Sequence, residues 1–131
     1  MILLDTHVLV WMVASPGKLS RAAVREIRKA QREGGCGIAS ISLWELGLLF
    51  AKGRLRASGT IEASIREIVE RAAVSVLELT PEIAGLAMVF PESYPKDPGD
   101  RLIGATARVH GIALITQDEK IIASPLVHTV W

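Results

Sequence analysis

Cysteine, histidine and aromatic residues are scarce in this chain of 131 residues. The single cysteine, Cys36, excludes an internal disulfide, which fits a protein of the reducing cytoplasm. His7, His110 and His128 show no ligand spacing with Cys36, and this argues against a zinc site. Because only 5% of the residues are aromatic, exposed rings on which a ligand could stack are not predicted.

Long apolar runs are also absent. No run approaches the roughly 18 residues that are needed to cross a bilayer. The apolar segment at residues 1–14 lacks the basic start of a signal sequence and contains Asp5 and His7, so we interpret it as structure. Half of the residues are hydrophobic, without a low-complexity tract or a linker. We therefore expect one soluble domain, residues 1–131, with a substantial core.

Short apolar runs alternate with stretches of helical periodicity. Strands are predicted at residues 2–4, 37–39, 76–79 and 113–116, with a candidate last strand at residues 127–130. Helices are predicted at residues 20–32, 43–52, 60–73, 80–90 and 97–110. This alternation predicts an α/β fold, in which a central, mostly parallel β-sheet is flanked by helices on both faces.

Four acidic residues are predicted to meet at one edge of this sheet. Ligands of such sheets bind outside the carboxyl ends of the strands. Asp5 follows the first strand directly and could also cap the first helix. Glu45 lies one helical turn past the second strand, and Asp118 comes just after the strand that ends at Thr116. Asp100 opens the last predicted helix and reaches the same edge only if the topology brings it there.

Each acid also has a local structural interpretation, as a helix cap or as an acid of a first turn. Glu45 could be the acid of a capping box that begins at Ser42. A second capping box could begin at Thr116, with Glu119 as its acid and Asp118 favouring the helix dipole. Asp97 could likewise cap the last predicted helix, which would leave Asp100 in its first turn.

The common position of the four acids favours a metal site over four separate caps. Crowded carboxylates repel one another unless a cation neutralises them, and a hard divalent cation such as Mg²⁺ prefers oxygen ligands. The formal net charge of the chain is +1. Without these four acids, 15 basic residues face the ten acids that remain of 14, so the rest of the chain has a formal excess of five positive charges. This division of charge suits a nuclease.

Four segments of the chain resemble the PIN-domain nucleases and, more narrowly, the VapC toxins of bacterial and archaeal toxin-antitoxin pairs. They are ILLDTHVL at residues 2–9, SISLWEL at 40–46, DPGDRLIGATA at 97–107 and LITQD at 114–118. The resemblance covers nearly the whole chain in the family's order. It implies a PIN-like three-layer sandwich, hydrolysis of single-stranded or loop RNA with Mg²⁺ or Mn²⁺ in an acidic pocket, a homodimer, and an antitoxin that occupies the pocket.

The resemblance also implies roles for individual residues. By motif position, the family's catalytic acids fall on Asp5, Glu45, Asp100 and Asp118. We expect Asp5 and Asp100 to bind the metal directly, and Glu45 and Asp118 to act through water or on a second ion. The small hydroxyl residue that precedes the last acid falls on Thr116, which would orient Asp118 or contact a phosphate.

Two positions near Asp100 qualify this resemblance. Asp97 matches an acid often present in the subgroup, although a cap is an equally good interpretation. Gly99 stands where the subgroup usually has an aromatic residue, which predicts a looser loop.

Three alternatives stay open: a non-catalytic PIN module that binds RNA or an antitoxin, a housekeeping nuclease, and a phosphotransfer protein. The last would need a second aspartate two residues after Asp5, where His7 stands.

Basic and large apolar residues outside these segments have less certain roles. Four arginines are predicted to form a stripe along one helix face, where they could follow a phosphate backbone, meet an acidic partner or be solvated: Arg21, Arg25, Arg28 and Arg32. Three basic residues beyond the helix of Glu45 are better placed for RNA: Lys52, Arg54 and Arg56. Four residues are expected in the core or at an interface: Val8, Trp11, Met12 and Trp44.

Overall fold

A computed structural model describes residues 1–131, and a parallel five-stranded sheet lies at its centre. The strands are β1 (Ile2–Leu4), β2 (Cys36–Ala39), β3 (Ser75–Leu77), β4 (Leu114–Ile115) and β5 (Thr129–Val130). Their order in the sheet is β3-β2-β1-β4-β5. Each strand overlaps a predicted run, so the predicted α/β class and parallel sheet are confirmed.

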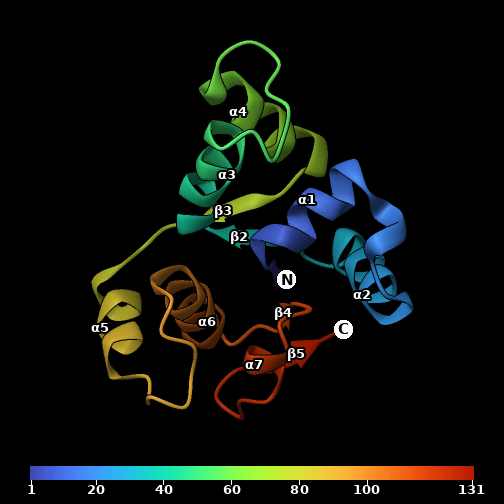
Figure 1. The fold of residues 1–131 in the computed structure, drawn as a ribbon. Helices are drawn as coiled ribbons and strands as arrows, with labels where there is room; N and C mark the ends of the chain where they lie inside the picture. The colour runs from blue at the N-terminus through green and yellow to red at the C-terminus, as the bar shows by residue number, and fades with distance from the viewer.

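At least one helix lies between each strand and the next, and the last two strands are joined through a short helix and a loop (Figure 1). The helices are α1 (Thr6–Ala14), the 3₁₀ segment η1 (Pro16–Lys18), α2 (Arg21–Arg32), α3 (Ile41–Ala51), α4 (Ile61–Ala72), α5 (Pro81–Val89), α6 (Pro98–His110) and α7 (Glu119–Ile122). Helices α2 to α6 match the five predicted ranges to within two residues at each end. None of the helices is long and apolar enough to cross a membrane.

Side-chain caps explain where the correctly predicted helices begin. The hydroxyl oxygens of Ser20, Thr60 and Thr80 accept hydrogen bonds from backbone amides in the first turns of α2, α4 and α5. Helices α1 and α7 lie outside the predicted helical ranges. The first is apolar on nearly every side and therefore shows no helical period, and the second is a single turn.

The sheet is buried on both faces by different sets of helices. Ile2 and Leu4 face a core shared with α1, α2, α3 and α4, whereas Leu3 faces a core shared with α5, α6 and α7. This alternation follows from the two-residue period of a strand. Figure 1 shows α5 and α6 side by side, well away from α1 and α2. The predicted three-layer sandwich of helices around a sheet is confirmed.

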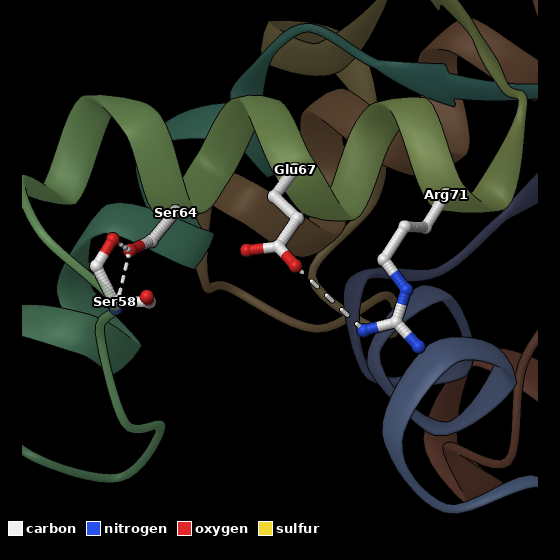
Figure 2. A network of polar contacts seen from close by, with 4 residues as sticks. All are labelled: Ser58, Ser64, Glu67 and Arg71. Carbon is white, nitrogen blue, oxygen red and sulfur yellow. Dashed lines mark hydrogen bonds and ion pairs between the residues drawn. The ribbon is translucent and has the colours of Figure 1, made fainter.

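Helix α4 carries the one ion pair of the chain. Figure 2 shows Ser64, near the start of α4, hydrogen-bonded to the backbone of Ser58 in the loop that leads into the helix, with the Ser58 amide donating at 3.0 Å. Farther along α4, Glu67 and Arg71 are 4.0 Å apart and both exposed (Figure 2). Such a pair contributes little to stability. Because it is the one ion pair, every other acidic side chain lacks an ion-pair partner within the chain.

The order of the strands brings the segments after β1, β2 and β4 together. Strand β1 lies between β2 and β4, and all three run in the same direction. The amide of Asp5 donates to the carbonyl of Ile115 at 3.0 Å, which places Asp5 beside Thr116. The carboxyl ends of the three strands therefore form one edge, from which α1, α3 and α7 continue.

Candidate active site

A cavity of about 630 Å³ lies at this edge of the sheet. All four aspartates of the chain line it, together with Glu45 and Glu119: the aspartates are Asp5, Asp97, Asp100 and Asp118. The structure thus brings the four predicted acids together, including Asp100, whose position depended on the topology. Thr116, the fifth predicted residue, is fully buried beneath the cavity and bonded to Asp5.

Asp5 is held at the start of α1 by two hydrogen bonds. Its Oδ1 accepts from the amide of Thr6 at 2.8 Å, so Asp5 caps α1. Its Oδ2 accepts from the hydroxyl of Thr116 at 2.7 Å. Burial raises the pKa of Asp5 in spite of these two bonds. The Thr116 hydroxyl also accepts from the amide of Asp118 at 3.1 Å, so it orients the side chain of Asp5 and the backbone of Asp118.

Glu45 is held by the Thr6 hydroxyl, and Ser42 supports Thr6 from behind; neither contact was expected from the sequence. The Thr6 hydroxyl donates to Glu45 Oε1 at 2.6 Å and lies 2.8 Å from the hydroxyl of Ser42. Because Thr6 donates to Glu45, Ser42 must donate to Thr6. The alternative interpretation of Glu45 as the acid of a capping box is therefore wrong: α3 begins after Ser40, and the Glu45 carboxylate turns toward α1. Both hydroxyl residues lie within three residues of the end of a predicted strand, which is the signal that could have indicated them.

Burial is also the main reason why the pKa of Glu45 is raised. The negative charges of Asp5 and Asp97 add to the effect, while the hydrogen bond from Thr6 opposes it. Glu45 thus stands in the repulsive field of other carboxylates.

Asp118 both caps a helix and lines the cavity. Its Oδ1 accepts from the amides of Lys120 at 2.9 Å and Ile121 at 3.3 Å, which opens α7. The alternative interpretation of a capping box that begins at Thr116 is wrong, because Asp118 is itself the cap. Asp5 combines the same two properties, so a structural role as a cap does not exclude a role in the cavity.

Asp100 differs from the other three predicted acids because its carboxylate has no hydrogen-bond partner in the chain. Asp97 caps α6 by accepting from the amide of Asp100 at 3.1 Å, as its alternative interpretation predicted. The Asp100 side chain is half-buried and points into a cluster of negative charge. Burial, followed by repulsion from Asp97 and the other cavity acids, raises the pKa of Asp100 to about 7.

Gly99 allows Glu45 to lie against the start of α6. A Cβ atom at position 99 would lie 2.6 Å from Glu45 Oε2 and 3.0 Å from Asp97 Oδ1. Gly99 is buried, and the space beside it is filled by these two carboxylates. The looser loop expected at Gly99 is therefore not what the structure shows. A side chain here would displace Glu45.

Arg101 follows Asp100 in sequence but does not neutralise it. Its guanidinium group turns away from the cavity and donates to four backbone carbonyls at 2.8 to 3.4 Å: those of Ala87, Phe90, Pro91 and Tyr94. The Tyr94 hydroxyl in turn donates to the carbonyl of Asp100 at 3.2 Å. These bonds fix the loop between α5 and α6, and through it they fix the start of α6, where Asp97 and Asp100 lie.

The donor set of the cavity fits a hard divalent cation. Its side chains offer carboxylate oxygens, they repel one another, and no lysine or arginine forms an ion pair with them. No three carboxylate, imidazole or thiol groups converge closely enough to be direct ligands of one ion. Mg²⁺ commonly binds through one or two carboxylates and several water molecules, so this arrangement fits an ion held partly through water.

The predicted basic groups lie elsewhere. The arginine stripe (Arg21, Arg25, Arg28 and Arg32) is exposed and lines a shallow groove of its own. The second basic group is also exposed and does not line the acidic cavity: Lys52, Arg54 and Arg56. Two lysines that sequence analysis missed, Lys96 and Lys120, line a groove that shares Asp97, Asp100 and Asp118 with the acidic cavity.

The fold and the cavity together define an α/β protein with an acidic site at the carboxyl edge of a parallel sheet. The sequence-family model of the PIN domain matches residues 2–124 of the chain. The chain is 36% identical to Ribonuclease VapC22 of Mycobacterium tuberculosis (strain ATCC 25618 / H37Rv) over 132 residues, covering 99% of this chain and 98% of the relative. This chain therefore belongs to the PIN-domain family, which confirms the resemblance seen in its motifs.

Solved structures share the same fold. VapBC2 from Rickettsia felis, bound to a DNA fragment from its promoter, matches with a TM-score of 0.68 and 14% identity, covering 98% of this chain and 97% of that one. DNA-bound VapBC from Salmonella typhimurium matches with a TM-score of 0.68 and 20% identity over the same shares. A toxin-antitoxin complex from Klebsiella pneumoniae matches with a TM-score of 0.66 and 20% identity, covering 97% and 95%.

Proposed function

We propose that this PIN-domain protein is a metal-dependent endoribonuclease and the toxin of a type II toxin-antitoxin system, acting in the cytoplasm as a single domain of residues 1–131. One observation carries the proposal: every aspartate of the chain, with Glu45, lines one cavity that has no lysine or arginine in its lining. The ribonuclease that is 36% identical over almost the whole chain supports RNA as the substrate.

A divalent ion is the component that this cavity needs. Asp5 and Asp100 would hold it directly, with Glu45 and Asp118 as ligands through water or of a second ion. Mg²⁺ and Mn²⁺ are our candidates, because both accept carboxylate and water ligands. When bound, such an ion activates water as a nucleophile and stabilises negative charge on the phosphate.

The residues of the chain contribute orientation and proton transfer. Thr116 and the Thr6 amide fix both oxygens of Asp5, and the Thr6 hydroxyl fixes one oxygen of Glu45. This leaves Glu45 Oε2 and both oxygens of Asp100 free of hydrogen bonds from the chain. A carboxylate that does not bind the ion directly is suited to accept a proton from attacking water, and either Glu45 or Asp118 could do so; burial raises the pKa of Glu45.

The partners follow from the relatives and from the charge of the chain. Several structural neighbours are VapBC toxin-antitoxin complexes, which supports an antitoxin as a protein partner. The basic excess outside the cavity suits RNA and an acidic protein segment alike. We also propose a homodimer, as the resemblance implies, and sedimentation of the purified protein across a range of concentrations tests it.

Cleavage of RNA by the antitoxin-free protein tests the proposed activity. A single-stranded RNA should be cut in Mg²⁺ or Mn²⁺ and left intact in chelator. Cutting should persist when the 2′-hydroxyl at the cleavage position is methylated, because a water nucleophile does not need that group. Asp5→Asn, Asp100→Asn and Glu45→Gln should each lose most activity, whereas Glu82→Gln, which changes an exposed acid of α5, should not.

Cleavage that continues in chelator, or that depends on the 2′-hydroxyl, would refute the metal-water mechanism. Wild-type activity in Asp5→Asn or Asp100→Asn would refute our choice of direct ligands. Expression of the active protein should arrest the growth of a host cell, and co-expression of a cognate antitoxin should restore growth. A cell that grows normally while the protein cuts RNA in vitro would instead indicate a housekeeping nuclease.

A further inference from the structure

The acidic cavity continues along α1 to two aromatic side chains. His7 and Trp11 both line it, one helical turn apart on the same face of α1. Their ring centroids are 6.1 Å apart, and the rings are inclined by 50°. We call these two side chains the aromatic wall. The aromatic wall was not expected from the low aromatic content, because composition does not show where the few rings lie.

Trp11 has a second tryptophan ring and a cation as neighbours. The ring of Trp131, which packs against the core, lies 5.8 Å from that of Trp11. Lys18 Nζ lies 6.0 Å from the centre of the Trp11 ring, at the outer limit of a cation–π contact. Lys18 is exposed, and so is His7, while Trp11 is half-buried. A fixed ring thus stands beside a long side chain that is free to move.

We propose that the aromatic wall binds the nucleotide next to the scissile phosphate, with its base stacked on Trp11 and its phosphate contacted by Lys18. This inference rests on the proposed cleavage of RNA. It assigns Trp11 as a substrate-binding residue and predicts that the substrate is single-stranded at this nucleotide, because a base within a duplex has no free face to stack on a side chain.

The charge of the site explains why such a contact is needed. The acids repel the phosphates of an RNA strand, so part of the binding energy must come from groups beside them. Stacking on a ring is insensitive to the charge of the cavity, and every base has a face that can stack. On another side of the acids, Lys96 and Lys120 line the adjoining groove. An RNA strand that crosses the acids would therefore meet Lys18 and the aromatic wall in one direction and Lys96 and Lys120 in another.

The spacing along α1 suits a neighbouring nucleotide. Trp11 lies six residues after Asp5, a rise of about 9 Å along the helix. The two residues share one cavity, so a ligand that reaches Asp5 with its phosphate has the aromatic wall within reach of its next nucleotide. This continuity favours RNA over a protein segment as the occupant of the aromatic wall.

The first test measures KM and kcat for a single-stranded RNA that the wild type cuts. Trp11→Ala should raise KM by about tenfold, the size of one lost base stack, and change kcat by no more than about twofold. Trp11→Phe should recover most of the affinity because a ring remains. Trp44→Ala is the matched control: Trp44 is 62% exposed and lies outside the cavity, so its KM should be unchanged.

The second test begins with the wild-type protein, so its first result does not depend on how a variant folds. The same RNA is prepared with an abasic nucleotide at one position on either side of the cut. One of these RNAs should show the tenfold rise in KM, and Trp11→Ala should add nothing further with that RNA, since base and ring form one interaction.

The outcomes separate the inference from the proposed function. An unchanged KM both for Trp11→Ala with intact RNA and for the wild type with every abasic RNA would overturn the inference alone. The same is true if Trp11→Ala weakens only the binding of the antitoxin, because the aromatic wall would then serve a protein. A wild-type protein that neither binds nor cuts RNA would overturn both.

Discussion

Removal of the Asp100 charge should stabilise the folded protein in the absence of metal. Asp100 is half-buried among other acids, has no hydrogen bond from the chain, and has its pKa raised from 3.8 to about 7. Asp100→Asn keeps the shape of the side chain and removes the repulsion. We therefore expect a variant that is more stable than the wild type, although its activity is lost.

The magnitude follows from the difference in pKa between the folded and unfolded states. A shift of about three units corresponds to about 4 kcal/mol at most. Asp100 is partly exposed, and screening by solvent reduces this to about 1–2 kcal/mol. Below pH 3.8 the group is protonated in both states and contributes nothing. Between pH 3.8 and 7 only the unfolded state loses the proton, so the free energy of unfolding falls as the pH rises, and the full cost is present above pH 7.

Urea denaturation in chelator, followed by tryptophan fluorescence at pH 4.5 and pH 8, measures this effect. Asp100→Asn should exceed the wild type by about 1–2 kcal/mol at pH 8 and lose most of that advantage at pH 4.5. Glu82→Gln, at an exposed acid outside the cavity, should change stability by less than about 0.5 kcal/mol. A variant less stable than the wild type at pH 8 would refute the idea that Asp100 is destabilised by its neighbours.

Three further variants test how the site is built. Thr6→Val should lower cleavage at least tenfold and destabilise the fold by about 1–2 kcal/mol, since it removes the hydroxyl that holds Glu45; full activity would show that this bond is dispensable. Gly99→Ala should displace Glu45 and reduce activity with little loss of stability, whereas Gly85→Ala, an exposed α5 position with open space, should leave activity unchanged and add up to about 1 kcal/mol. Arg101→Met should lower the free energy of unfolding by about 2–4 kcal/mol in urea titrations, because four carbonyls lose a charged donor; a change below 1 kcal/mol would contradict this role.

Local pattern determined most of the fold. The apolar runs identified all five strands, and hydroxyl caps with helical periodicity identified α2 to α6. Both signals depend only on near neighbours in sequence, and for this reason they can be read without the structure. Helix α1 was indicated only by its possible cap, Asp5, because apolar residues occupy nearly every position of the helix and no helical period appears. The motifs also indicated the four acids that now line one cavity, although their roles stay predictions until tested.

Only the tertiary structure decided what each side chain of the site contacts. Residues 42–45 have the pattern of a capping box, yet Glu45 binds Thr6, 39 residues away, because β1 and β2 lie side by side. The buried Thr116 bonds to Asp5 across 111 residues for the same reason, since β4 pairs with β1. Trp11 could not be assigned to core, interface or cavity from helical spacing alone. These properties depend on strand order and long-range packing, which near-neighbour patterns do not contain.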